Sequence, residues 1–380
     1  MQSTNKYKTW IEISKKALYH NVNVYKKAVG KNVKIAAVVK ANAYGHGLKE
    51  IVSLLDKKVD MFAVDRLEEA FLIQKYGRET PILILGYTRL SNLKEVINNN
   101  ISFVVYNIET LKKIVDLDLN MQAKVHLKIE TGLNRQGVQL KTVKKILSYI
   151  EKYRNKILLE GISTHFANIE DTLDPSYAMK QNTLFKKAIK EIKKAGFKPK
   201  LVHASASAGA LLYPETHFSM VRIGFGLYGW WMSTETRVML LAKNPKLDLK
   251  PVMTWKSVIA QIKTINVGEA VGYGLTWFAS RKTKIAIIPV GYSDGYDRKL
   301  SNIGRVIVNG KHAPVIGRIA MNMFVVDITD VGDVKVEDEV VLLGNNSGLK
   351  ISADEIAKKI GTINYEVISR INSDIPKIVT

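Results

Sequence analysis

The stretch IAAVVKANAYGHG, residues 35–47, ends a run of apolar residues with a lysine and continues into a loop that contains two glycines. Five apolar residues precede Lys40, which is typical of a short buried strand that leads into a functional loop. Seven further apolar runs follow before residue 236, separated by segments whose apolar residues have helical spacing. The eight runs are 35–39, 61–64, 82–85, 101–105, 124–129, 159–164, 201–204 and 220–223.

Eight alternations of strand and helix in about 200–250 residues predict a TIM barrel, with a doubly wound parallel sheet as the alternative. After about Arg237 the runs become β-like with few helical segments, and Asn309-Gly310 predicts a hairpin turn. We therefore expect an α/β TIM barrel in residues 1–240 and a mostly β C-terminal domain in residues 241–380. Roughly the first 10 residues are expected to pack with the C-terminal domain.

The charge of the chain is strongly positive, with 57 Lys and Arg against 35 Asp and Glu. Such a balance suggests nucleic acid or an anionic membrane surface as a partner. However, 45 of these cations are lysines spread along helical segments, whereas phosphate-reading surfaces favour arginine. We therefore expect solvated helix faces and no nucleic-acid partner.

Two absences in the sequence narrow the function classes. The chain has no cysteine, which excludes disulfides, thiolate nucleophiles and cysteine-ligated metal sites, and we predict no metal site. It has no apolar stretch of membrane-spanning length and no apolar segment near the N-terminus, so we predict no membrane segment and a cytoplasmic location.

Several reactive side chains end the predicted strands, where a barrel builds its active site. Lys40, Lys128, His165 and Arg222 each end or directly follow an apolar run, and Ser207 follows LVHAS. An amine at the mouth of a buried strand is partly desolvated and can form a covalent bond with a carbonyl compound. Lys40 is therefore a candidate covalent anchor.

The sequence resembles the bacterial alanine racemase family over essentially its whole length. VVKANAYGHG, residues 38–47, is similar to the pyridoxal-phosphate attachment motif of that family, and eight further stretches match in the family's order. These are HLKIETGLNRQGV (126–138), GISTHFA (161–167), HASASAGAL (203–211), MVRIGFGLYG (220–229), VGYGLTW (271–277), VGYSDGY (290–296), IGRIAMNM (316–323) and TINYEV (362–367).

This resemblance implies a pyridoxal-phosphate-dependent isomerase that interconverts L- and D-alanine and supplies D-alanine for peptidoglycan. It implies a homodimer with shared active sites, in which Lys40 holds the cofactor and acts as a base on one face of the substrate. Tyr273 of the partner subunit would be the base on the opposite face, with His165 and Arg222 as its neighbours. Arg222 would also contact the cofactor's pyridine nitrogen without giving up its proton.

The remaining implied roles concern the cofactor phosphate and the substrate. The phosphate would be bound by Tyr44, Ser207, Tyr365 and the backbone near Gly224 and Phe225. The substrate carboxylate would meet Arg135, which is oriented by Lys128, a lysine that is carbamylated in many relatives. Tyr292 would line the substrate channel, and Met321 of the partner subunit would contact the carboxylate.

Three departures from the family pattern leave room for alternatives. Ala206 and Asn322 stand where asparagine and aspartate are usual, and the acidic spacing at Glu170 and Asp171 is shifted. One alternative is a serine racemase related to the catalytic half of membrane-anchored vancomycin-resistance racemases. A Schiff-base aldolase and a non-catalytic pyridoxal-phosphate-binding protein are further alternatives, but neither gives the tyrosine in VGYG a role. Tyr365 keeps the usual aromatic side chain, which favours alanine.

Overall fold

The computed structural model describes residues 6–171 and 173–380, and the chain divides into two compact units that interleave in sequence. The barrel unit comprises Ala17–Ala41 and Ile51–Lys250. The β unit comprises Met1–Lys16, of which residues from Lys6 are described, together with Asn42–Glu50 and Pro251–Thr380. The loop that follows Lys40 thus belongs to a different unit from Lys40 itself.

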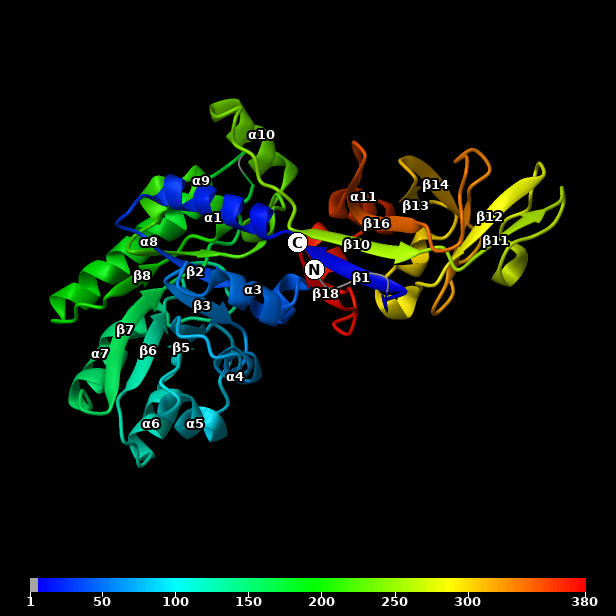
Figure 1. Ribbon diagram of the computed structural model, residues 1–380. Helices are drawn as coiled ribbons and strands as arrows, with labels where there is room; N and C mark the ends of the chain where they lie inside the picture. The colour runs from blue at the N-terminus through cyan, green and yellow to red at the C-terminus, as the bar shows by residue number, and fades with distance from the viewer. Residues whose placement is uncertain (1–5, 172) are drawn as a thin grey trace. The chain divides into compact units, whose positions relative to one another are not determined.

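Eight parallel strands close the barrel unit, each bonded to the next in chain order, and the last returns to the first through Lys34↔Met220. They are β2 (Lys34–Val38), β3 (Met61–Val64), β4 (Ile82–Ile84), β5 (Ser102–Val105), β6 (Ala123–Lys128), β7 (Ile157–Ser163), β8 (Leu201–His203) and β9 (Met220–Ile223) (Figure 1). Each predicted run overlaps one strand, so the predicted TIM barrel is confirmed and the doubly wound sheet is wrong.

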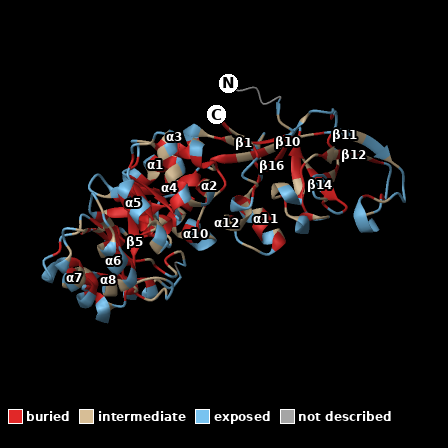
Figure 2. Cartoon of the chain, turned by 90° about the horizontal axis from the view of Figure 1, so that it is seen from below, coloured by how far each residue is buried: buried red, intermediate tan, exposed pale blue. Residues whose placement is uncertain are grey.

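Amphipathic helices accompany the barrel strands. In α7, for example, Val143, Ile146, Leu147 and Ile150 are buried and the lysines between them are exposed. Figure 2 shows buried residues along the barrel strands and exposed residues on the outer helix faces. The helices are α1 (Lys15–Val29), α3 (Leu48–Leu55), α4 (Leu67–Lys75), α5 (Leu93–Asn98), α6 (Ile108–Asp116), α7 (Val143–Lys152), α8 (Ser176–Lys194), α9 (Ser207–Leu212) and α10 (Thr234–Lys243).

The β unit is built on one continuous path of strands in the order β11-β12-β15-β14-β13-β16-β10-β1-β18, with β17 paired to β16. β1, from the start of the described chain, pairs antiparallel with β10 and parallel with β18. The strands are β1 (Thr9–Ile13), β10 (Met253–Val258), β11 (Gln261–Ile265), β12 (Thr283–Ile288), β13 (Arg305–Val308), β14 (Lys311–Ile316), β15 (Phe324–Asp327), β16 (Glu339–Asn346), β17 (Leu349–Ile351) and β18 (Lys377–Val379). The mostly β C-terminal domain is confirmed.

The Asn309-Gly310 hairpin forms as predicted, and two other features differ in detail. Both turn residues have positive φ, 45° and 73°, as a two-residue turn between β13 and β14 requires. The single run 257–265 is two strands, because the amides of Ile259 and Ala260 bond to different neighbours, Asp338 and Ile287. Two helices not predicted from the sequence, α11 (Ala353–Ile360) and α12 (Asn364–Ser369), follow β17.

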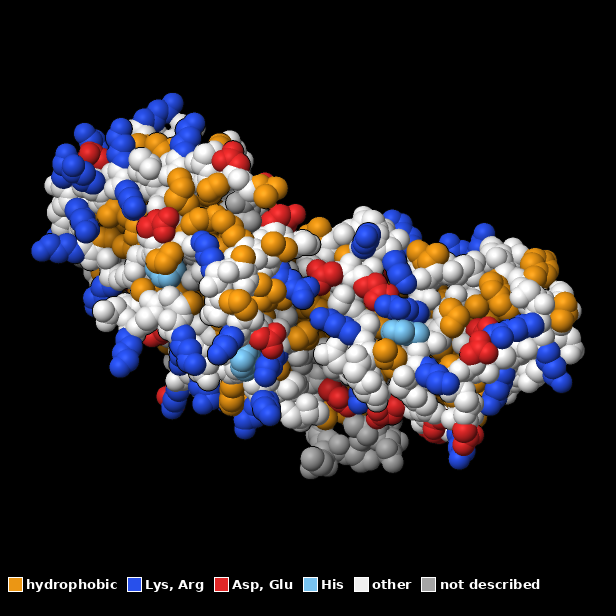
Figure 3. All heavy atoms as spheres, turned by 90° about the horizontal axis from the view of Figure 1, so that it is seen from above, with side chains coloured by type: hydrophobic (Ala, Val, Ile, Leu, Met, Phe, Trp, Pro, Cys, Tyr) orange, Lys and Arg blue, Asp and Glu red, His pale blue; other side chains and the backbone are white. Residues whose placement is uncertain are grey.

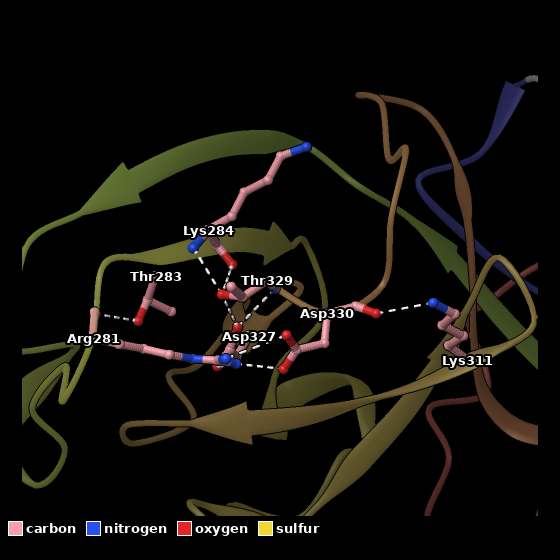
Figure 4. Close-up of polar contacts among 7 residues, drawn as sticks. All are labelled: Arg281, Thr283, Lys284, Lys311, Asp327, Thr329 and Asp330. Atoms are coloured by element: carbon pink, nitrogen blue, oxygen red, sulfur yellow. Dashed lines mark hydrogen bonds and ion pairs between the residues drawn. The ribbon is translucent and has the colours of Figure 1, made fainter.

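A polar cluster ties the segment after β15 to the start of β12 (Figure 4). Thr329 donates its hydroxyl to Asp327 at 2.6 Å and accepts the amide of Lys284 at 2.9 Å. Arg281 forms two hydrogen bonds with the carboxylate of Asp330. These groups are largely exposed, so this ion pair contributes little to the free energy of unfolding.

Most lysines and arginines lie on the surface, as the sequence pattern indicates, and Lys128 and Arg222 are buried exceptions. In the face shown in Figure 3 they are scattered among neutral and apolar side chains over both units. Among the described residues, no helix combines the length and the apolar composition that crossing a membrane requires.

Candidate active site at the carboxyl ends of the barrel strands

Lys40 follows β2 and opens an unusual turn. The four residues Ala41–Tyr44 all have φ between 52° and 54°, so α2 (Lys40–Tyr44) winds in the left-handed sense over non-glycine residues. Each such residue costs about 1–2 kcal/mol. Strain of this kind persists only where surrounding contacts impose it, and it is concentrated at functional sites.

Polar side chains hold the turn at both ends. The buried carboxylate of Glu69 accepts the amide of Ala41 at 2.6 Å and that of Asp65 at 3.0 Å. At the far end, the Asn42 side chain accepts the amide of Leu48 at 2.7 Å. These bonds therefore fix the turn that directly follows Lys40.

Arg222 lies on β9, is 6% exposed and has both terminal nitrogens engaged. Nη1 donates to Nδ1 of His203 at 2.6 Å, and Nη2 faces the carbonyls of Thr164 and Ala204 at 3.0 and 2.8 Å and Nδ1 of His165 at 3.2 Å. A guanidinium only donates, so His165 carries its proton on Nε2. No described residue accepts the Nε–H of Arg222, which leaves this donor for a ligand.

Five predicted site residues influence one another electrostatically within the barrel unit. Burial, then the charges of Arg222 and Arg135, lower the pKa of Lys128 to about 8. Burial and the same arginines hold the pKa of His165 well below its usual range, so its imidazole is neutral at pH 7. Lys40 also contributes to both shifts. The structure therefore brings Lys40, Lys128, Arg135, His165 and Arg222 together at one mouth of the barrel.

The loop that carries Arg135 is fixed by Glu130. Burial alone would raise the pKa of this carboxyl, but backbone N–H groups of residues 132–135 hold it below its usual range. One of these bonds joins the amide of Gly132 to Oε1 of Glu130 at 2.5 Å. An ionised Glu130 thus anchors the backbone on which the exposed Arg135 side chain stands.

Ser207 and the glycines after β9 form a small cradle at the same mouth. The Ser207 hydroxyl accepts the amides of Gly224 and Gly226 at 3.1 and 3.3 Å. A methyl group on Gly226 would overlap the hydroxyl of Tyr25, which is fully buried and has no hydrogen-bond partner among the described residues. Ala206 is the N-cap of α9 and supplies no side-chain cap bond. Backbone amides and hydroxyls in a confined space are a typical anion site.

The remaining predicted residues lie in the β unit on adjoining loops. The amides of Tyr292 and Ser293 bond to the carbonyls of Ala320 and Met321 at 3.1 and 3.0 Å, which joins two of these loops. Gly274, the residue after Tyr273, packs against Arg318, because a methyl group on Gly274 would lie 2.9 Å from the guanidinium. Tyr273 is 75% exposed, and Tyr292 and Met321 are exposed as well.

Tyr44 and Tyr365 also belong to the β unit. The loop after Tyr44 packs on α12, which carries Tyr365, because a methyl group on Gly45 would overlap the carbonyl of Ile368. The two tyrosines therefore stand on neighbouring segments.

Sequence reasoning assigned no role to three groups that the structure connects to Arg222. His203 and His126 lie in the quoted motifs HASAS and HLKIETG, and Glu160 directly precedes GISTHFA. The sequence signal that could have identified them is the presence of a carboxylate and two histidines on neighbouring strands. Their connection depends on three-dimensional packing inside the barrel.

Comparison with known proteins identifies the family. The family described as alanine racemase, N-terminal domain, matches residues 13–230, and the alanine racemase C-terminal domain matches residues 252–379. An alanine racemase of Leptospira interrogans is 40% identical over 376 residues, which cover 98% of this chain and 96% of that protein.

Solved structures agree with this assignment. The alanine racemase of Clostridium difficile 630 superposes with a TM-score of 0.91 at 35% identity, covering 99% of this chain and 96% of that chain. The Bacillus anthracis alanine racemase with bound L-Ala-P has a TM-score of 0.91 at 32% identity, covering 98% and 95%. The chain belongs to the alanine racemase family.

Proposed function

We propose that this enzyme interconverts L- and D-alanine with pyridoxal phosphate as cofactor, using Lys40 and Tyr273 of the partner subunit as two opposed bases. The observation that supports this most strongly is Arg222, which keeps one donor for a ligand beside a neutral His165 and near Lys40. Racemisation requires proton exchange on both faces of one carbon, which two groups on opposite sides provide.

The residues present fit pyridoxal phosphate. The Ser207 hydroxyl and the amides at Gly224–Gly226 would bind the phosphate, with Phe225 in the same loop and the phenols of Tyr44 and Tyr365 as further donors. When bound, the cofactor supplies an electron sink for the electron pair left at the substrate carbon. Arg222 would donate its Nε–H to the ring nitrogen and retain its proton, which keeps that sink weak and favours rapid reprotonation.

The two bases would act from opposite faces. Lys40 would hold the cofactor covalently and would also be the base that takes or returns the proton at one face of the substrate Cα. Tyr273 would do the same from the other face, with the neutral His165 and the cationic Arg222 nearby to favour loss of its phenolic proton. Arg135 and Met321 of the partner subunit would position the substrate carboxylate, and Tyr292 would line the entrance.

A homodimer is supported by the surface that carries Tyr273. Large apolar side chains are exposed on these loops of the β unit, and such a concentration is typical of a protein interface. They are Tyr273, Leu275, Phe278, Tyr292, Met321 and Met323. A second copy of the chain would cover this surface and receive Tyr273 in its own site.

Racemisation of alanine is tested with holoenzyme in deuterated water. We expect L-alanine to become D-alanine that carries deuterium at Cα. We expect L-serine to react with about 10- to 100-fold lower kcat/KM, since one extra hydroxyl changes the activation free energy by about 1–3 kcal/mol in a pocket that offers it no hydrogen-bond partner. Chiral chromatography and mass spectrometry measure both. Faster turnover of serine would favour the serine racemase alternative, and deuterium uptake without inversion would contradict the two-base scheme.

Lys128 is proposed to carry a carbamate that orients Arg135. Its pKa of about 8 makes the neutral, CO2-reactive amine far more abundant than on a surface lysine. The amine would add CO2 and lose a proton, and the resulting anion would replace a cation that Arg222 and Arg135 repel. With 13C-bicarbonate we expect a carbamate NMR signal that increases as the pH rises from about 7 to about 9, because the neutral fraction increases.

The matched variants for this signal lie on one strand. Lys128→Gln should abolish it, and Lys124→Gln on the same β6 should leave it unchanged. A signal that persists in Lys128→Gln, or its absence in the unmodified enzyme, would contradict the assignment.

A further inference from the structure

A continuous chain of hydrogen bonds runs from Arg222 to the far mouth of the barrel. Beyond the Arg222–His203 bond, Nε2 of His203 lies 2.8 Å from Nδ1 of His126, and Nε2 of His126 lies 3.1 Å from Oε2 of Glu160. The Ser102 hydroxyl donates to the same carboxylate oxygen at 2.5 Å. Both imidazoles are fully buried, and the Glu160 side chain is 19% exposed.

The far end of the chain opens at the amino-terminal mouth of the barrel. Glu160 lines a polar cavity there together with the first residues of several strands, among them Lys34 of β2 and Ser102 of β5. The carboxylate is thus on the opposite side of the barrel from the catalytic loops, which follow the carboxyl ends of the strands. The hydrogen bonds through His126 and His203 connect this carboxylate to Arg222.

Local backbone features make room for this chain. The register between β6 and β7 shifts between Val125 and His126, which leaves Glu160 as the extra residue of a β-bulge. Bulges commonly redirect a side chain. The next residue is Gly161, where a methyl group would lie 2.5 Å from Nδ1 of His126. A side chain at this position would therefore displace the ring.

Arg222 at one end of the hydrogen-bond chain and Glu160 at the other determine which ring nitrogen of His203 and of His126 carries the proton. Arg222 only donates, so Nδ1 of His203 accepts and its proton is on Nε2. That proton is donated to Nδ1 of His126, whose own proton is then on Nε2 and is donated to Glu160. Burial and the charge of Arg222 hold the pKa of His203 well below its usual range. Bonds from His126 and Ser102 outweigh burial and hold the pKa of Glu160 below its own.

We propose that Glu160 is a positioning residue for Arg222. Through His126 and His203 it keeps Nδ1 of His203 unprotonated, so that this nitrogen accepts a hydrogen bond from Nη1 of Arg222. This bond holds the guanidinium in the orientation in which its Nε–H points at the ligand. This inference rests on the proposed function, since the ligand is the cofactor ring. An ionised carboxylate accepts and does not donate, so it allows only one direction of proton donation along the chain. A glutamine could also donate to His126, which would place a proton on Nδ1 of His203 against the guanidinium.

The direct test is the tautomer of each histidine, read by 15N NMR of histidine-labelled holoenzyme. We expect His126 and His203 both to carry the proton on Nε2 in the unmodified protein. A proton on Nδ1 of His203 would overturn the proposal without any variant. This measurement is independent of turnover, so it holds or fails separately from the proposed racemase function.

The second test compares two carboxylates of the same cavity. Glu160→Gln is expected to give a mixture of tautomers, to weaken pyridoxal-phosphate binding by the apoenzyme about ten-fold and to lower kcat about ten-fold, because a bond to a charged partner is lost. Glu79 lines the same cavity, but its carboxylate pairs with Lys57 at 2.9 Å and takes no part in the hydrogen bonds that lead to Arg222. Glu79→Gln should therefore change none of these three properties. If a folded Glu160→Gln matches Glu79→Gln in all three measurements, the proposal is wrong.

Discussion

Lys40→Ala is expected to lower kcat for alanine racemisation by about 10⁴-fold or more, because the proposed covalent anchor and one of the two proposed bases would be lost together. The measurement is the initial rate in both directions, with cofactor content determined separately by absorbance. Lys34→Ala is the matched control, since Lys34 begins the same strand and is exposed. Its rate should remain within about two-fold of the unmodified enzyme.

The position of the covalent link checks the same assignment independently. Borohydride treatment of the holoenzyme followed by proteolysis should leave the cofactor mass on the peptide that contains Lys40. A label on any other lysine would contradict the role of Lys40.

Tyr273→Phe is expected to lower racemisation by about 10²–10⁴-fold while one enantiomer still exchanges its Cα proton with solvent. Under the proposed mechanism, the remaining Lys40 would remove and return a proton on its own face, but nothing would protonate the opposite face. The rate of Cα deuteration in deuterated water, measured separately for L- and D-alanine, distinguishes the two faces. Tyr149→Phe, on the outer helix α7, is the control and should racemise normally. Equal loss of exchange for both enantiomers would contradict the assignment of Tyr273 to one face.

Much of the barrel could be predicted from the sequence, because a strand buried on both faces must be nearly all apolar. The run Met61–Val64 is buried at every position, and β3 has the same bounds as the predicted run. Lys40 and Arg222 could be identified for a related reason, since a charged residue at the end of an apolar run is placed at the mouth of the barrel.

Other features depend on contacts that sequence patterns do not encode. The left-handed turn at Ala41–Tyr44 opposes local preference and is maintained by Glu69, a residue 28 positions away from Ala41 in sequence. The proposed role of Glu160 depends on a bulge in the β6–β7 register, which periodicity cannot reveal. The assignment of Asn42–Glu50 to the β unit likewise follows from packing, such as that of Gly45 on α12.

The proposal that two subunits share each active site is tested most directly by mixing two inactive variants, Lys40→Ala and Tyr273→Phe, under conditions that exchange subunits. Each mixed dimer would contain one site with both substitutions and one intact site. Random exchange should therefore restore about a quarter of the activity of the unmodified enzyme. If mass spectrometry shows that mixed dimers form and the activity stays at the level of the separate variants, the amine and the phenol do not come from different chains and the account is wrong.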